Sequence, residues 1–93
     1  MVKHIVMYKL KDISNADQMI ERFLSMRGKI DVLKSLCAGK DVIRSARAYD
    51  VALVCEFDSL EDLEIYASHP VHVPVKEFVH SVIAEAHSVD FVC

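Results

Sequence analysis

Four segments of the chain carry the apolar patterns that are typical of β-strands: residues 2–10, 36–43, 51–57 and 84–92. In Val2–Leu10 the even-numbered and the odd-numbered residues, which face opposite sides of a strand, are both apolar near the centre of the segment. Lysines lie toward its ends. Val51–Phe57 is apolar on both sets as far as Glu56. A strand that is apolar on both faces is expected to be covered on both faces. The weaker segment 36–43 contains Gly39, which predicts a bulge or a close backbone approach.

Apolar residues at helical spacing predict a long amphipathic helix between the first two strands. It begins at Ser14–Asp17, where a serine hydroxyl can cap the free amides and an aspartate lies in the first turn. The apolar face of this helix consists of Met19, Ile20, Phe23, Leu24, Ile30 and Leu33. The pattern continues to near Lys34, although Gly28 weakens the helix locally.

A second helix is predicted after the third strand, and a proline ends it. Ser59 is the expected N-cap, with Asp62 three residues later as in a capping box. Pro70 disfavours helical geometry at His69 and therefore ends this helix. Pro74 suits the first turn of a third, short helix. The apolar face of that helix is formed by Val75, Phe78, Val79 and Val82.

The resulting β-α-β-β-α-β order predicts an α+β, ferredoxin-like fold with an antiparallel sheet. The 93 residues form one domain, 1–93. Both helices would cover one face of the sheet, and the opposite face is apolar. A second copy of the chain is the commonest way to cover such a face. We therefore expect a homodimer that packs through its open sheet faces into a dimeric α/β barrel, with a cavity between the two sheets.

Composition and charge argue against some classes of binding partner, such as nucleic acids and membranes. The chain is 53% hydrophobic and carries a formal net charge of −3, without a cluster of Lys and Arg, which argues against nucleic acid binding. No apolar run approaches the roughly 20 residues of a membrane-spanning helix, and the N-terminus lacks the apolar core of a signal peptide. Three cysteines without a CxxC pair favour reduced thiols. We therefore expect a cytoplasmic protein that contacts no membrane.

The segment Tyr66–His72 places a phenol and two imidazoles around a proline. Imidazole exchanges a proton near neutral pH because its unperturbed pKa is about 6.5. One hypothesis is that His72 is a general base that removes a proton alpha to a carbonyl, while Tyr66 or His4 hydrogen-bonds the developing oxyanion. The alternative is that His69 and His72 bind backbone groups at the helix break. In that case Tyr66 is a core residue.

The first strand offers two further polar side chains, His4 and Tyr8, which share a face with Val2 and Val6. If that face lines the cavity between the two sheets, both are polar points in an apolar pocket, as in ligand sites. If it contacts the helices, His4 is a hydrogen-bonded core histidine. We expect the cavity side, and we take Tyr8 and His69 as candidate ligand-binding residues.

No cofactor and no metal site is predicted. His69 and His72 are three residues apart, but Pro70 between them spoils a regular helical pairing. The chain has neither an HExxH motif nor a Cys/His spacing typical of zinc sites.

Five segments carry a family resemblance when they are taken together: His4–Lys11, Gly39–Asp41, Tyr49–Leu63, Tyr66–His72 and Val89–Phe91. They resemble the stress-responsive A/B barrel (Dabb) domain family over nearly the whole chain. The resemblance implies a homodimeric α/β barrel of the ferredoxin-like class. The HPxH block within Tyr66–His72 marks the family at large, including members without a known reaction.

The same family includes a plant polyketide cyclase, and the resemblance extends to its site. In that enzyme the last His of the HPxH block acts as the base, the Tyr three residues before HP assists it, and a His on the first strand lies in the same pocket. The matching positions here are His72, Tyr66 and His4, and all three residue types are present.

Two functional hypotheses follow. The first is a small homodimeric protein that binds a small apolar ligand in the barrel cavity, without catalysis of its own. The alternative is a cofactor-independent enzyme of polyketide cyclase or isomerase type that uses His72 as a base on a carbonyl-containing ligand. A cofactor-free monooxygenase, as found among other dimeric α/β barrels, is a third option that no residue here specifically supports.

Overall fold

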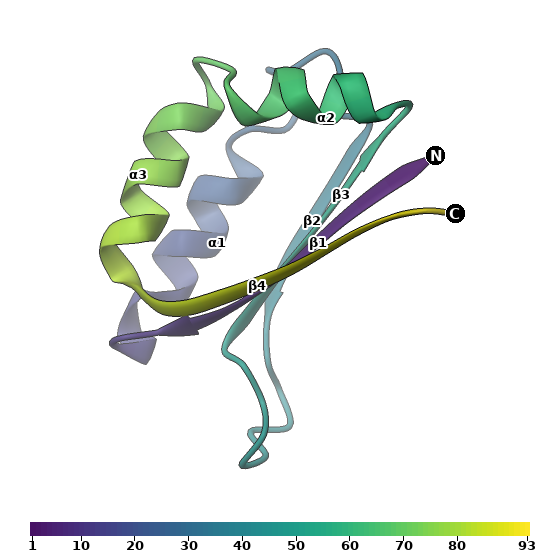
Figure 1. Cartoon of the computed structure of the whole chain (residues 1–93). Helices are drawn as coiled ribbons and strands as arrows, with labels where there is room; N and C mark the ends of the chain where they lie inside the picture. Colours follow the sequence, from purple (N-terminus) through teal and green to yellow (C-terminus); the bar gives the residue numbers. More distant parts are fainter.

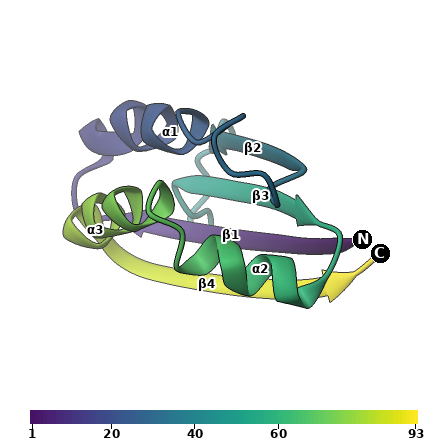
Figure 2. The same ribbon diagram turned by 90° about the horizontal axis from the view of Figure 1, so that it is seen from above.

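A four-stranded antiparallel sheet carries all the helices on one face, as Figures 1 and 2 show. The computed structural model describes every residue from 1 to 93. Its elements are β1 (Val2–Leu10), the 3-10 turn η1 (Ile13–Asn15), α1 (Ala16–Leu24), β2 (Ser35–Lys40), β3 (Val51–Phe57), α2 (Leu60–Ala67), α3 (His72–Val82) and β4 (Ile83–Val92). The spatial order is β2-β3-β1-β4. The predicted ferredoxin-like, βαββαβ arrangement is therefore confirmed.

The alternating side chains of β1 separate a buried face from an open one. Val2, Val6 and Tyr8 are buried against the helices. Ile5 and Met7 belong to the other set, and Met7 is 45% exposed. His4 shares the parity of the buried set, so it lies on the helix side of the sheet. The expectation that its face lines a cavity between two sheets was wrong. Because both faces of β1 are apolar, parity alone could not decide which face the helices cover.

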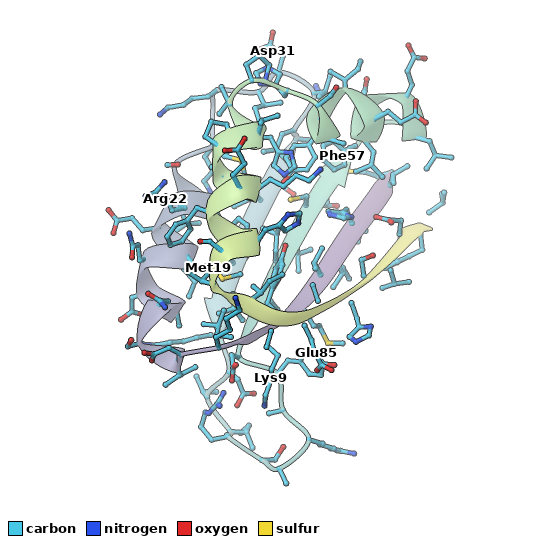
Figure 3. All side chains as sticks on the ribbon, turned by 60° about the vertical axis from the view of Figure 1, so that its left-hand side comes forward. Lys9, Met19, Arg22, Asp31, Phe57 and Glu85 are labelled. Carbon is cyan, nitrogen blue, oxygen red and sulfur yellow. The ribbon has the colours of Figure 1, made fainter.

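The core fills the layer between the helices and the sheet. Its fully buried side chains include Phe57, Met19, Leu53 and Cys55, and Figure 3 labels the first two of these in that layer. From β3, Leu53, Cys55 and Phe57 point toward the helices at every second position, as a strand requires. Burying side chains of this size stabilises the fold by about 1.5–3 kcal/mol each before the entropy cost is subtracted.

The helix α1 is shorter than its apolar spacing predicts, because it ends at Leu24 rather than near Lys34. Gly28 has a φ of +75°, a left-handed conformation that a helix does not accommodate. The chain turns there toward β2, and the Arg27 guanidinium donates two hydrogen bonds to the Leu36 carbonyl at 2.9 and 2.6 Å. Met26 and Ile30 are buried all the same. Their helical spacing therefore reflects burial in successive turns, not a continuous helix.

The irregularity of the sheet lies in β4, at Ala84, and not at Gly39. The β1–β4 register shifts between Lys9 and Leu10. At this point the Asp50 carboxylate accepts a hydrogen bond from the Leu10 N–H at 2.8 Å. Gly39 instead pairs in regular register with Ala52, and a Cβ added to it would meet nothing within 4 Å. The predicted bulge or close approach at Gly39 is therefore absent.

The helices α2 and α3 begin and end as the sequence predicts. The Ser59 hydroxyl accepts a hydrogen bond from the Asp62 N–H at 3.1 Å and caps α2. The helix ends at Ala67, three residues before Pro70. Pro74 lies in the first turn of α3, which buries Val75 and Val79 against the sheet. None of the helices is long and apolar enough to span a bilayer.

The face of the sheet opposite the helices is open and largely apolar. Figure 1 shows no helix on that side. Val89 and Phe91 of β4 are 54% and 40% exposed there, opposite Ile5 and Lys3 of β1. We call this surface the open face and define it by Ile5, Met7, Cys37, Ala52, Val54, Val89 and Phe91. Charged residues such as Lys9 and Glu85, which Figure 3 labels, lie at its rim.

Candidate functional site

A cleft of about 370 Å³ opens between α3 and the strands β1 and β4. It lies inside one protomer, on the helix side of the sheet, and not between two sheets as predicted. Its apolar wall includes Val6, Tyr8, Phe23, Val79, Ile83 and Ala86, and its polar groups are His4, His72, Lys76, His80, His87 and Ser88. An apolar wall with a few convergent polar groups is typical of a small-molecule site.

His72 lies at the first position of α3 and lines this cleft. Its Nδ1 is 3.0 Å from the Ala67 carbonyl, which the end of α2 leaves without a helical partner. A carbonyl can only accept, so Nδ1 carries the proton and Nε2 is the unprotonated nitrogen of the neutral ring. From the sequence, binding of a backbone carbonyl and action as a general base were alternative roles for His72. In the structure one ring serves the backbone through Nδ1 and keeps a basic nitrogen.

The surroundings of His72 favour its neutral form. Burial lowers the pKa of this imidazole, more than the Ala67 carbonyl raises it, and the positive charge of Lys76 lowers it further. At neutral pH the ring is therefore unprotonated and able to accept a proton.

Tyr66 stands behind His72 and does not line the cleft. Its ring stacks on the His72 ring, with centroids 4.2 Å apart, and meets the His4 ring edge-on at 6.4 Å. The buried hydroxyl is close to the Cys55 thiol but forms no hydrogen bond of normal geometry. Burial raises the pKa of Tyr66, so the phenol stays protonated. Burial also raises the pKa of Cys55, to about 12, so this thiol is no nucleophile at neutral pH.

His4 is held by a carboxylate that sequence analysis did not assign to it. Its Nδ1 pairs with Asp90 Oδ1, across the register position at which β1 and β4 place the two residues opposite each other. This contact fixes the orientation of the ring at the edge of the cleft. The signal was hidden, because only the pairing register of two distant strands brings position 4 opposite position 90.

Of the two candidate ligand-binding residues, Tyr8 lies in the cleft and His69 does not. Tyr8 lines the cleft and packs on Phe23 with ring centroids 5.6 Å apart, and burial raises the pKa of its hydroxyl. His69 lies outside the cleft. Its Nδ1 accepts a hydrogen bond from the Val71 N–H at 3.0 Å and supports the turn between α2 and α3. The structure contains no group of three or more His, Cys, Asp or Glu side chains arranged to hold a metal ion.

Comparison with known families assigns the chain to one of them. The model of the stress responsive A/B barrel domain (Dabb) matches residues 2–93. This chain is a Dabb protein. Its relatives include a stress-response A/B barrel domain-containing protein of Arabidopsis thaliana, which is 33% identical over 95 residues. The alignment covers 98% of this chain but only 36% of that relative, so the Dabb chain spans about a third of its length.

Two further relatives bear on site and assembly. The olivetolic acid cyclase of Cannabis sativa is 30% identical over 77 residues, which are 77% of this chain and 76% of the cyclase. A crystal structure from Bacteroides fragilis, described as a dimeric protein of unknown function with a ferredoxin-like fold, superposes with a TM-score of 0.88. It is 28% identical, and the match covers 99% of this chain and 95% of that one.

Four polar cleft residues of this Dabb chain were not recognised in the sequence: Lys76, His80, His87 and Ser88. Two of them, Lys76 and His80, lie on α3. With His72 they follow one another at intervals of four residues along α3. The spacing was visible in the sequence, but its meaning depends on α3 starting at His72 and running without a break. His80 alone formed no recognisable cluster.

Proposed function

We propose that this Dabb chain binds a small, largely apolar ligand in the cleft between α3 and the strands β1 and β4. The observation that carries the proposal is the combination of an apolar wall with the imidazoles of His4 and His72 in one cleft of about 370 Å³. This volume falls within the roughly 300–1,000 Å³ of small-molecule sites. Tyr8 and Phe23 would contact the apolar body of the ligand.

A neutral ketone with an alkyl chain, octan-2-one, is a suitable probe for this cleft. Titration into ¹⁵N-labelled protein should shift amide resonances of α3, β1 and β4. The Ala86→Phe variant fills the cleft and should abolish these shifts. Ala46→Phe, in the exposed loop between β2 and β3, is the matched control and should bind as the parent does. Equal binding by Ala86→Phe would place the ligand elsewhere and refute the proposal.

A second candidate function is proton abstraction by His72, and a specific observation favours it. The hydrogen bond from Nδ1 to the Ala67 carbonyl leaves Nε2 unprotonated beside a cleft that takes a ligand. We infer a step in which Nε2 takes a proton from the carbon alpha to a carbonyl, and the C–H electron pair becomes the enolate. His4, whose ring Asp90 orients through Nδ1, lies in the same cleft, and its Nε2 would face the enolate oxygen. The likeness to olivetolic acid cyclase supports this reading.

Hydrogen–deuterium exchange at the alpha carbon of octan-2-one in D₂O tests this second function. The amide of an Asn at position 72 can still donate to the Ala67 carbonyl, so His72→Asn removes the base and retains the backbone contact. We expect it to lower exchange by about 100-fold, the lower end of general-base contributions. His69→Asn, outside the cleft, is the control. Exchange that is the same in His72→Asn and the parent would rule out this role.

We further propose that the open face is the contact surface of a homodimer. A sheet face with Met7, Val89 and Phe91 exposed is more apolar than a free protein surface usually is. The Bacteroides fragilis protein, which is similar over the whole chain, is described as dimeric. Sedimentation velocity at micromolar concentration tests the proposal, and a monomer would contradict it.

We also propose that the protein resides in the cytoplasm. All three cysteines, Cys37, Cys55 and Cys93, are free thiols. Free thiols persist in reducing compartments. Fractionation of cells that produce the tagged protein tests this location, and recovery outside the cytoplasm would contradict it.

A further inference from the structure

One wall of the cleft carries a line of basic side chains. His72, Lys76 and His80 occur at positions i, i+4 and i+8 of α3, and all three line the cleft. Residues four apart lie on the same face of a helix. The buried residues Val75 and Val79 of the same helix, each one position before a member of this line, contact the core. The helix therefore holds its apolar stripe against the sheet and presents the basic line along the cleft.

No acidic side chain of the cleft neutralises this line. None of the cleft residues is an Asp or a Glu. The nearby carboxylate of Asp90 is paired with His4, and Glu85 accepts a hydrogen bond from the Tyr49 hydroxyl at 3.3 Å. The Lys76 ammonium takes part in none of the ion pairs of the structure. Lys76 is thus an unpaired cation at the rim of an apolar cleft.

The opposite wall adds a hydrogen-bond donor. Ser88 of β4 lines the cleft across from α3. Lys76 and Ser88 therefore give the cleft one donor on the α3 wall and one on the β4 wall. Beside Ser88, its register partner Val6 and the α1 residue Phe23 offer only apolar surface.

We propose that the ligand of this cleft is an amphipathic organic anion, with a carboxylate or phosphate bound by Lys76 and His80 and an alkyl or aryl body against Val6 and Phe23. The inference rests on the proposed ligand-binding function and adds the chemical class of the ligand. A charge-assisted hydrogen bond from an ammonium to an oxyanion is stronger than a neutral one. The neutral ketone should therefore be the weaker ligand of the same site.

Three probes of equal chain length test the proposal: octanoate, octyl phosphate and octan-2-one. Their affinities are measured by NMR titration of the full chain. Either anion should bind about tenfold or more tightly than the ketone, and the tighter of the two identifies the oxyanion. Lys76→Met retains the length and apolar stem of the side chain. It should weaken anion binding about three- to tenfold, and ketone binding by a smaller factor. Lys29→Met, outside the cleft, is the matched control.

The outcomes separate the two proposals. If the ketone binds as tightly as both anions, or if Lys76→Met changes nothing, the anionic class is refuted while the cleft remains a ligand site. If neither the anions nor the ketone respond to Ala86→Phe, the cleft is not the binding site, and the inference fails together with the proposed function. If Lys29→Met weakens anion binding as much as Lys76→Met does, the loss reflects the net charge of the protein and not a contact in the cleft. That result would also overturn the inference.

Discussion

His72 binds the backbone through Nδ1 and keeps Nε2 unprotonated, two features that its sequence context presented as alternatives. It closes the end of α2 through Nδ1 and the Ala67 carbonyl, and the same hydrogen bond sets the tautomer of the ring. A helix end that needs a donor thereby produces a neutral imidazole with a basic Nε2. The HPxH block is a feature of the fold, and the unprotonated Nε2 results from the hydrogen bond by which His72 closes the end of α2.

The protonation of His72 can be followed directly. Burial lowers its pKa from the usual value near 6.5, and the charge of Lys76 adds to this effect. A ¹³C or ¹⁵N NMR titration of the ring should therefore give a pKa below 6.5. Lys76→Met should raise this pKa but not restore the usual value, because burial remains. A pKa at or above 6.5 in the parent would contradict the assignment.

The lowered pKa also sets a dependence of stability on pH. Since the folded protein disfavours the charged ring, its contribution to stability is present above pH 6.5 and is lost as the pH falls through the lower, folded-state pKa. The difference in unfolding free energy between the parent and His72→Asn should therefore shrink as the pH falls below about 6.5. Urea denaturation at a series of pH values measures it. A difference that grows toward acid would contradict the sign.

Tyr66 permits a separation of packing from chemistry. Its hydroxyl is buried without a hydrogen-bond partner. Burial therefore costs the free energy of desolvating this group, and no hydrogen bond in the folded protein offsets that cost. Tyr66→Phe retains the ring that stacks on His72, and it should leave the unfolding free energy unchanged or raise it by up to about 1 kcal/mol. Chemical denaturation checks this expectation. A loss of more than about 1 kcal/mol would show that the hydroxyl has a partner in the folded protein.

At the scale of elements, one buried carboxylate, that of Asp50, binds the end of β1 where its register with β4 shifts. Burial raises the pKa of Asp50, but the Leu10 N–H, Arg44 and Lys9 outweigh burial, and the net shift is downward. Asp50→Ala leaves the Leu10 N–H without its partner and should cost about 1–3 kcal/mol of unfolding free energy. Asp41→Ala, which removes the other acidic partner of Arg44, should cost less than about 1 kcal/mol.

The acid limb of the denaturation curve provides the second readout for Asp50. A carboxyl with a lowered pKa stabilises the fold above its usual value near 3.8, and this contribution is lost as the pH falls through the folded-state pKa. The penalty of Asp50→Ala should therefore diminish below pH 3.8. A penalty that stays constant to pH 2, roughly two units below the usual value, would mean that the carboxylate charge does not contribute.

The elements that the sequence predicted well are those with local causes. The cap at Ser59 and the helix break at Pro70 depend on neighbouring residues, and both occur as predicted. The end of α1 does not, because Met26 and Ile30 maintain a helical period while they are buried in turns. The face of His4 was missed for a related reason. When both faces of a strand are apolar, only the packed helices decide between them.

The parts of the site that the sequence missed depend on long-range geometry. His4 and Asp90 are 86 positions apart, and only the β1–β4 register brings them together. Lys76 and His80 gained their meaning when α3 was seen to run unbroken from His72 along the cleft. The residues of the HPxH block, which lie close in sequence, were found without the structure.

At the scale of the whole molecule, ligand binding and assembly are assigned to different faces of the sheet. The helix face contains the cleft, apart from His87, which pairs in register with Met7 at the edge of the open face, and the rest of the open face is left for assembly. A single protomer contains every residue that lines the cleft. If the dimer forms through the open face, assembly and ligand binding use opposite sides of one sheet. Disruption of the dimer should then leave the cleft intact.

A charge at the centre of the open face tests this division. Met7 lies in the central strand β1 and is 45% exposed, so Met7→Lys would bury an unpaired ammonium in a dimer but leave it solvated in a monomer. We expect Met7→Lys to sediment as a folded monomer at micromolar concentration and to bind octan-2-one with about the affinity of the parent. Val42→Lys, at a loop residue 85% exposed, should remain dimeric. A Met7→Lys protein that stays dimeric would move the interface away from the open face, whereas a folded monomer that no longer binds the ketone would show that the cleft needs the partner.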